Sequence, residues 1–188
     1  MDVVTGRPAR LSAGATTGAG PGALTLTTDS AEGTRRLAAS LAPLCLPGDV
    51  LLLAGDLGAG KTTFAQGFAA GLGIAGAVTS PTFVLVHQYP VQGRPPVRVL
   101  LHADVYRLDH LHEIADLGLA ELVEDGGVAL VEWGDAAQPV LGSGALVVRL
   151  AAADDDQRRA VVVAPTDDAW SDRWDRLTAA VAPWVDRP

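Results

Sequence analysis

The sequence lacks the features typical of disulfide-bonded proteins, of membrane-spanning proteins and of proteins that bind nucleic acids through a basic surface. It has one cysteine, Cys45, so no disulfide can form within the chain and a reducing compartment fits. No apolar run approaches the roughly 20 residues that a membrane-spanning helix needs. With 14 basic and 22 acidic residues the formal net charge is −8, which argues against a surface that binds a nucleic-acid backbone unaided. We therefore expect a cytoplasmic protein without a membrane contact.

Length and composition predict one domain with a tail. Residues 1–22 are mostly Gly, Ala, Ser, Thr and Pro, and they lack the apolar stretch of a signal peptide. We expect this segment to be a disordered tail. The remaining residues, 23–188, belong to a chain that is 48% hydrophobic, which is enough to build one core.

The most informative segment is residues 55–63, GDLGAGKTT, which match the phosphate-binding pattern G-x-x-x-x-G-K-[ST]. Glycines in this pattern let backbone N–H groups approach phosphates without a Cβ in the way. Lys61 places a positive charge where the β- and γ-phosphates meet, and the Thr62 hydroxyl supplies one Mg²⁺ ligand. The segment therefore predicts a nucleoside triphosphate site.

The surroundings of this loop support the prediction. Residues 49–54 (DVLLLA) are typical of a short buried strand, and Phe64, Phe68 and Leu72 recur at helical spacing after the loop. A helix that begins at the loop points the positive end of its dipole at the phosphates. A chance match in a chain with 21 glycines remains the alternative, and the flanking strand and helix make it the weaker one.

Other patterns predict further elements. Expected strands are 24–27, 83–89, 97–103 and 128–131, with an antiparallel hairpin of strands near 145–151 and 158–163 around a turn at 154–156. Expected helices are one to about residue 44, capped by Asp29 or Ser30, and one over 108–123 with Leu111, Ile114, Leu117 and Leu122 facing inward.

The final segment, residues 168–185, has an apolar stripe at helical spacing. The stripe consists of Trp170, Trp174, Leu177, Val181 and Trp184. One interpretation is a docking face for a partner protein, because Trp is frequent in interface hot spots. The favoured interpretation is a terminal amphipathic helix packed on its own sheet.

Two acidic residues stand where apolar strands end, which is where α/β folds place their ligands. Asp104 follows strand 97–103, and Glu132 follows strand 128–131. Each is a candidate for the carboxylate that holds Mg²⁺ in phosphate-loop hydrolases. The structural alternatives are that Asp104 caps the following turn and that Glu132 is an exposed strand-end carboxylate.

Specificity for the base is less directly encoded. No Asn-Lys-x-Asp or Thr-Lys-x-Asp segment for reading guanine occurs, so ATP is favoured by default. Thr82 is either a sensor of the γ-phosphate or only the start of a strand. Arg107 and the pair Arg158–Arg159 are the best cationic candidates for phosphates, although such pairs are often a solvated strand edge. The four histidines have no spacing typical of a zinc site.

Four blocks of the sequence together resemble the bacterial TsaE (formerly YjeE) family, whose members are ATPases of tRNA threonylcarbamoyladenosine biosynthesis. The blocks are 55–64 (GDLGAGKTTF), 80–83 (SPTF), 102–108 (HADVYRL) and 131–133 (VEW). The loop alone is widespread, whereas its combination with D-x-Y-R-L and E-W is specific. The resemblance covers residues 24 to about 163, and Gly134-Asp135 departs from the frequent proline-rich pattern.

The resemblance implies an α/β fold of the P-loop NTPase type, with a mixed sheet flanked by helices. It implies ATP as ligand, Mg²⁺ held by Thr62 and Glu132, and catalytic roles for Lys61, Asp104 and Glu132. The implied nucleotide contacts are Leu57, Gly58, Ala59, Gly60, Lys61, Thr62, Thr63, Asp104, Trp133 and a late-hairpin residue near Gln157 or Arg158.

For function, the resemblance implies an ATPase that is weak alone and acts with a TsaB-like scaffold and a TsaD-like transferase. These subunits modify adenosine 37 of tRNA, so tRNA contact is expected only through the complex. Two alternatives stay open. One is a P-loop small-molecule or nucleoside kinase, although no arginine-rich lid is evident. The other is a module that binds ATP without hydrolysing it.

Overall fold

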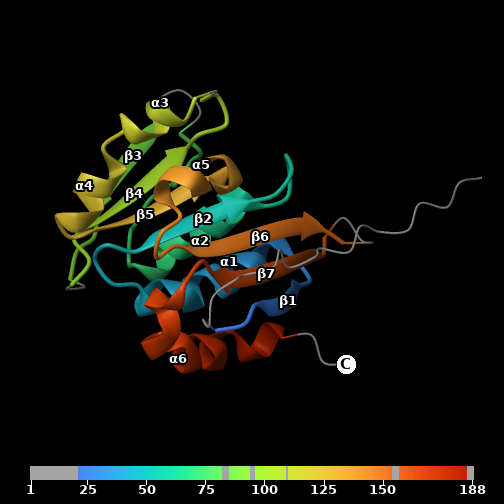
Figure 1. Ribbon diagram of the computed structural model, residues 1–188. Coiled ribbons are helices and arrows are strands. Elements are labelled where there is room, and N and C mark those ends of the chain that lie inside the picture. Colours follow the sequence, from blue (N-terminus) through green and yellow to red (C-terminus); the bar gives the residue numbers. More distant parts are fainter. Residues whose placement is uncertain (1–20, 82–84, 94–95, 109, 154–156, 186–188) are drawn as a thin grey trace, which may run out of the picture.

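The structure, a computed structural model, describes residues 21–81, 85–93, 96–108, 110–153 and 157–185. The described strands form one seven-stranded sheet in the order β1-β7-β6-β2-β5-β4-β3 (Figure 1). The strands are β1 Leu24–Thr28, β2 Val50–Ala54, β3 Val86–Pro90, β4 Val99–Asp104, β5 Gly127–Glu132, β6 Leu146–Ala152 and β7 Arg159–Pro165.

The sheet is mixed. Strand β2 runs parallel to both of its neighbours, β5 and β6, and β5 also runs parallel to β4. The outer pairs β1–β7, β6–β7 and β3–β4 are antiparallel. This arrangement confirms the predicted fold class, a mixed sheet of the P-loop type, and it confirms the hairpin of β6 and β7.

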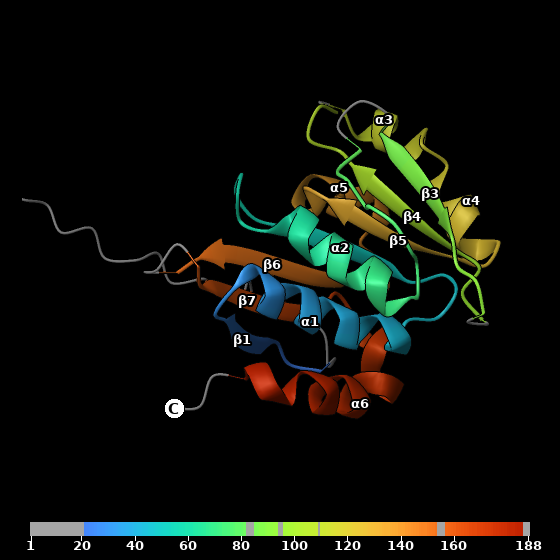
Figure 2. The ribbon, with the colours of Figure 1, turned by 180° about the vertical axis from the view of Figure 1, so that it is seen from behind.

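Helices cover both faces of the sheet. One face is covered by α1 Ala31–Leu41, α2 Lys61–Gly71 and α6 Ser171–Val181, and the other by α3 Leu111–Ala115, α4 Leu119–Glu124 and α5 Gly134–Leu141 (Figures 1 and 2). Alternation along the strands sends successive side chains into two separate apolar clusters. Leu51 and Leu53 of β2 enter the α1–α2 cluster, whereas Val50 and Leu52 enter the α3–α5 cluster. None of the described helices is both long and apolar enough to cross a membrane.

Helices α1 and α2 lie side by side on their face, as Figure 2 shows, and two glycines of α2 permit the close approach. A Cβ at Gly67 would lie 2.2 Å from the carbonyl oxygen of Arg35, and one at Gly71 would lie 2.6 Å from that of Ala39. Helix α1 starts as expected, because the Ser30 hydroxyl accepts a hydrogen bond from the Gly33 N–H at 3.0 Å. The close contact between α1 and α2 fixes the position of α2, and therefore also the position of its first turn next to the phosphate loop.

The structure differs from the sequence-based expectation between β4 and β6. The single helix expected over 108–123 is instead two short helices, because Gly118 adopts a left-handed φ of +64° between them. Ile114 is buried as expected, but Leu111 is 49% exposed. Helix α5 was not predicted, since its eight residues begin with glycine and contain Pro139. Thr82, Phe83 and the turn at 154–156 lie outside the described residues.

The C-terminal segment packs against the chain's own sheet. It consists of a 3₁₀ turn Asp168–Trp170, helix α6 and a second 3₁₀ turn Ala182–Trp184. Trp170, Leu177 and Val181 are buried in the same cluster as β1 and α1. Trp174 and Trp184 pack on this cluster while staying partly exposed. The apolar stripe predicted from the sequence therefore packs against the chain's own core, as the favoured interpretation expected.

An ion pair ties this segment to β2, the strand that leads into the phosphate loop. The Arg173 guanidinium donates to both carboxylate oxygens of Asp49, at 2.5 and 2.7 Å, and lies 4.0 Å from the centre of the Trp170 ring. Bidentate geometry makes such a pair stronger than a single contact. The Trp170 indole also donates to the Gly144 carbonyl at 3.0 Å, so it is anchored at its polar end.

These contacts predict that Trp170→Ala lowers the free energy of unfolding by about 3–5 kcal/mol, as large-to-small core changes do. Trp174→Ala is the matched control, because its side chain is partly exposed, and we expect a loss of about 1 kcal/mol. Urea unfolding followed by circular dichroism measures both. Equal losses for the two variants would contradict this description of the helix.

Candidate functional site

The phosphate loop connects β2 to α2 at the carboxyl edge of the parallel strands. Its backbone needs glycine at two positions that bound it. Gly55 has φ +135°, and a Cβ there would lie 2.2 Å from the Leu150 carbonyl oxygen of β6. Gly60 has φ +106° and immediately precedes Lys61, the first residue of α2. Leu57, at the tip of the loop, is 88% exposed. A loop that leads into a helix start in this way offers backbone amides and the positive end of the helix dipole to an anion.

Lys61 is the only lysine in the chain, and its side chain turns into the loop. Its ammonium donates to the carbonyls of Gly55 and Asp56 at 2.8 and 2.9 Å. It also lies 3.7 Å from the centre of the Trp133 ring, a cation–π contact. Burial lowers the pKa of Lys61, and the nearby carboxylates, Glu132 foremost, oppose that shift. A phosphate at this position would add a further group that favours the charged form.

Glu132 ends β5 and lies against the start of α2. The Thr62 hydroxyl is 3.0 Å from each of its carboxylate oxygens. On the other side, the His102 Nε2 is 2.9 Å from Oε1. Glu132 is 3% exposed, so the alternative of an exposed strand-end carboxylate is wrong. Thr62 and Glu132, the two residues expected to hold Mg²⁺, therefore lie in direct contact.

Asp104 is the register partner of Glu132 on the neighbouring parallel strand. Its Oδ2 accepts a hydrogen bond from the Ser80 hydroxyl at 2.7 Å, and its Oδ1 accepts one from the Tyr106 N–H at 3.0 Å. The second contact shows that Asp104 does cap the turn that follows β4, as the structural alternative held. The same residue also brings a second carboxylate to the edge of the sheet where the loop lies.

Trp133 takes a left-handed backbone conformation with φ +61°, which is rare for a large side chain. Its ring lies between Lys61 and Tyr106, whose ring centre is 4.6 Å away at an interplanar angle of 37°. This conformation lets the chain turn from β5 straight into α5 at Gly134, where a Cβ would lie 2.6 Å from that of Leu52. The left-handed backbone of Trp133 thus places its aromatic ring beside the Lys61 ammonium.

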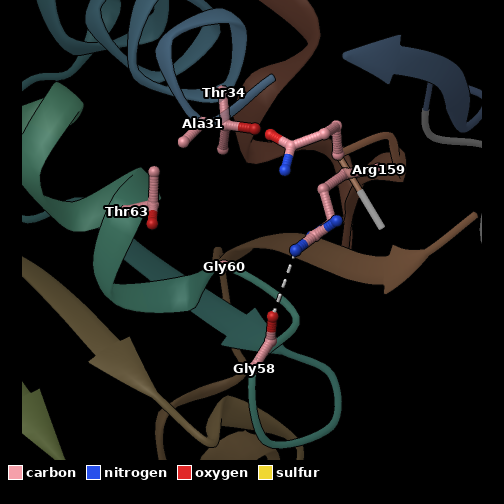
Figure 3. A pocket seen from close by; sticks show the side chains of 7 residues that line it. Ala31, Thr34, Gly58, Gly60, Thr63 and Arg159 are labelled. Carbon is pink, nitrogen blue, oxygen red and sulfur yellow. Dashed lines mark hydrogen bonds between the residues drawn. The ribbon is translucent and has the colours of Figure 1, made fainter. Parts of the chain in front are cut away.

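A pocket of about 240 Å³ adjoins the loop on the side of α1 (Figure 3). It is lined by Ala31, Thr34, Gly58, Gly60, Thr63, Gln157 and Arg159. Arg159 reaches across from β7, and its Nε donates to the Ala59 carbonyl at 3.0 Å and its Nη2 to the Gly58 carbonyl at 3.4 Å. Figure 3 shows the guanidinium pointing at Gly58.

The late-hairpin residue expected at the nucleotide was near Gln157 or Arg158, and the side chains of this hairpin that line the pocket beside the loop are those of Gln157 and Arg159. Side chains alternate along a strand, so Arg159 shares with Val161 and Val163 the face that looks toward α1 and α2. Arg158 lines a different cavity, with Arg36 and Trp184. Gln157, the other residue expected, does line the pocket beside the loop.

The oxygen ligands present fit Mg²⁺. No group of three or more His, Cys, Asp or Glu side chains suited to a metal occurs within the ranges that the structure describes. Mg²⁺ bound with a nucleotide usually takes one or two protein oxygens and fills its octahedron with phosphate oxygens and waters. The Thr62 hydroxyl and the Glu132 carboxylate, which lie in contact at the start of α2, would supply that number of ligands.

Two site residues escaped the sequence reasoning. His102 was considered only as a zinc ligand and given no role, although it lies two positions before Asp104 and therefore on the same strand face. Ser80 was part of a recognised block without a role. Alternation in strand 97–103 was the signal available for His102, whereas the Ser80 contact depends on how a loop folds back onto β4.

The chain is similar to known proteins over the region that contains this site. The family model for "Threonylcarbamoyl adenosine biosynthesis protein TsaE" matches residues 28–161. A Bacillus subtilis protein of the same name is 51% identical over 102 residues, which are 54% of this chain and 61% of that protein. The chain thus spans less than two thirds of that relative's length. A Mycobacterium bovis TsaE is 41% identical over 132 residues, 67% of this chain and 77% of that protein.

The fold comparison points the same way. The crystal structure of Bacillus subtilis YdiB superposes with a TM-score of 0.67 and 35% sequence identity, and the match covers 86% of this chain and 95% of that one. The family match spans all four sequence blocks, from the phosphate loop to Glu132-Trp133. Because the TsaE family model matches residues 28–161, which is more than half of the chain, this chain belongs to the TsaE family.

Proposed function

We propose that this protein binds ATP with Mg²⁺ and hydrolyses it as an accessory subunit of the complex that forms N6-threonylcarbamoyladenosine at position 37 of tRNA. The observation that carries the proposal is the contact of Thr62 with Glu132 at the start of α2, beside the phosphate loop of a TsaE-family chain. Membership of this family also favours an ATPase over the kinase alternative.

The loop amides and the start of α2 would hold the phosphates, and Lys61 would neutralise their charge. The pocket beside Gly60 and Thr63 would take the nucleoside, since it opens directly from the loop. Arg159, at the rim of this pocket, brings a second cation to the phosphates. Mg²⁺ held by Thr62 and Glu132 would neutralise charge that develops on the γ-phosphate.

The reaction proposed is in-line attack of water on the γ-phosphate. Asp104 is the candidate for orienting that water, because it stands level with Glu132 at the end of the adjacent strand. Ser80 and the Tyr106 N–H hold its two oxygens, which fixes the carboxylate plane. A fixed hydrogen-bond acceptor at this place costs no reorganisation when the water attacks.

The partners proposed are a TsaB-like and a TsaD-like subunit in the cytoplasm. Hydrolysis by phosphate-loop enzymes often depends on a group that a partner supplies, worth ~10³–10⁵-fold in rate. The net charge of −8 suits a subunit that leaves tRNA contact to its partners.

The proposal predicts that ATP turnover by the isolated protein is feeble and rises at least ~10³-fold in the presence of both partner subunits. Phosphate release at saturating ATP measures the rates. Glu132→Gln is the matched control and should abolish the stimulated rate while still forming the complex. Equal turnover with and without the partners would refute the accessory role, and unchanged binding and turnover in Glu132→Ala would favour an ATP-binding module without hydrolysis.

Lys61→Ala should weaken ATP binding by about 1.5–3 kcal/mol, the range for hydrogen bonds to charged groups. That loss corresponds to roughly ten- to hundredfold in the dissociation constant. Isothermal titration measures it. Because Lys61 is the only lysine, amine acetylation followed by mass spectrometry reports on it directly, and Mg-ATP should protect it. An affinity change below twofold, or no protection, contradicts the assigned role.

Arg159→Ala should weaken ATP binding about tenfold, which is close to 1.4 kcal/mol. The change removes the bonds to Ala59 and Gly58 and a cation next to the phosphates. Arg158→Ala removes the same side chain from the neighbouring position, which lines another cavity, and should bind ATP as the parent does. A larger loss in Arg158→Ala would show that the nucleotide lies on the other side of the hairpin.

A further inference from the structure

His102 is a fully buried polar side chain in an otherwise apolar position of β4. Its exposure is 0%, and it shares the α2-facing side of the strand with Leu100. Its register partner on β5 is Leu130, which belongs to the same apolar cluster. Burying an imidazole among such residues lowers stability unless both ring nitrogens find partners. Packing alone would favour another leucine here.

Only one of the ring nitrogens is paired. Nε2 lies 2.9 Å from Oε1 of Glu132, whereas Nδ1 is buried and has no hydrogen-bond partner among the described residues. A carboxylate oxygen only accepts, so we assign the ring proton to Nε2, which leaves Nδ1 as a bare acceptor. A half-satisfied polar group contributes less to stability than an apolar one of similar shape. The contact with Glu132 is thus the feature that distinguishes histidine from leucine at this position.

The contact is directed at one oxygen of the carboxylate. Glu132 lies two positions beyond Leu130 on β5, so the His102 ring reaches it diagonally from the adjacent strand. His102 engages Oε1, while the Thr62 hydroxyl lies 3.0 Å from both oxygens on the opposite side. The carboxylate is therefore held between β4 and the first turn of α2, with Oε2 the oxygen that His102 leaves open.

We propose that His102 is a positioning residue whose Nε2–H fixes the Glu132 carboxylate, so that Oε2 is presented to the divalent cation beside Thr62. The proposal rests on the proposed function, because it requires Glu132 to be a cation ligand. Outer-shell donors that orient a ligating carboxylate change metal affinity by about 10–100-fold when removed.

The test measures the ATP affinity of each His102 variant at increasing Mg²⁺ concentrations. The quantity compared is the Mg²⁺ midpoint, the concentration at which half of the Mg²⁺-dependent gain in ATP affinity is reached. Calorimetry supplies ATP affinities across a Mg²⁺ series and in EDTA. We expect His102→Leu to raise this midpoint about tenfold or more while its ATP affinity in EDTA stays within twofold of the parent. His102→Gln places an amide N–H near the position of Nε2 and should restore the midpoint to within about threefold, whereas the shorter His102→Asn should not.

His87→Leu is the matched control. His87 is the register partner of His102 on β3, and its ring contacts Tyr89 rather than Glu132. It should leave the Mg²⁺ midpoint unchanged. A His102→Leu midpoint within twofold of the parent overturns the positioning role. If His102→Leu does not fold, the comparison of His102→Gln with His102→Asn decides, and equal midpoints for these two overturn the proposal.

The Glu132→Gln variant distinguishes a failure of the positioning role of His102 from a failure of the proposed function. A raised midpoint in Glu132→Gln with an unchanged one in His102→Leu leaves the cation site standing and removes only the role of His102. An unchanged midpoint in Glu132→Gln removes the cation site itself, and the positioning role with it.

Discussion

Strand β5 lies between β2 and β4 and runs parallel to both, so three carboxyl ends meet at one edge of the sheet. The phosphate loop leaves the end of β2, Glu132 ends β5, and Asp104 ends β4. Parallel register then sets the distances, because Asp104 and Glu132 are direct partners across the strands. A slip of one residue in β5 would turn Glu132 toward the opposite face and away from Thr62.

The same alternation separates the site from the second core. Positions 100, 102 and 104 of β4 look toward α2, whereas Leu101 and Ala103 pack under α3, α4 and α5. Buried polar side chains occur at few places in the described chain, and each of them has at least one hydrogen-bond partner, although the His102 Nδ1 atom has none. Asp49 pairs with Arg173 behind the loop strand and Thr28 pairs with Thr34, whereas four of the buried polar or charged side chains, Lys61, His102, Asp104 and Glu132, gather at the loop. Polar burial therefore marks the site as clearly as the motif does.

Much of this arrangement is predictable from the sequence, because it depends on local patterns. The loop, the strand before it and the helix after it follow from glycine positions and apolar periodicity, and so do Asp104 and Glu132 as strand ends. The break at Gly118 and the helix α5 are not predictable in this way, since short helices depend on tertiary packing more than on propensity. Which hairpin side chain faces the loop depends on the strand boundary, which the sequence does not define closely: Arg159 lies at the loop, whereas Arg158 lines another cavity. The pairing of Arg173 with Asp49 spans 124 positions, and no local pattern encodes such a contact.

Charge distribution explains how an acidic chain can present a phosphate site. Its 14 basic residues include a single lysine, and that lysine stands at the loop. The phosphate loop needs few side-chain cations, because backbone amides and the start of α2 supply fixed partial charges. An RNA backbone differs, since its affinity grows with the number of Lys and Arg side chains that contact phosphates. One lysine, a guanidinium at Arg159 and an excess of carboxylates suit a nucleotide far better than a tRNA. Under the proposed function, the charge distribution therefore assigns ATP binding to this subunit and tRNA binding to the partner subunits.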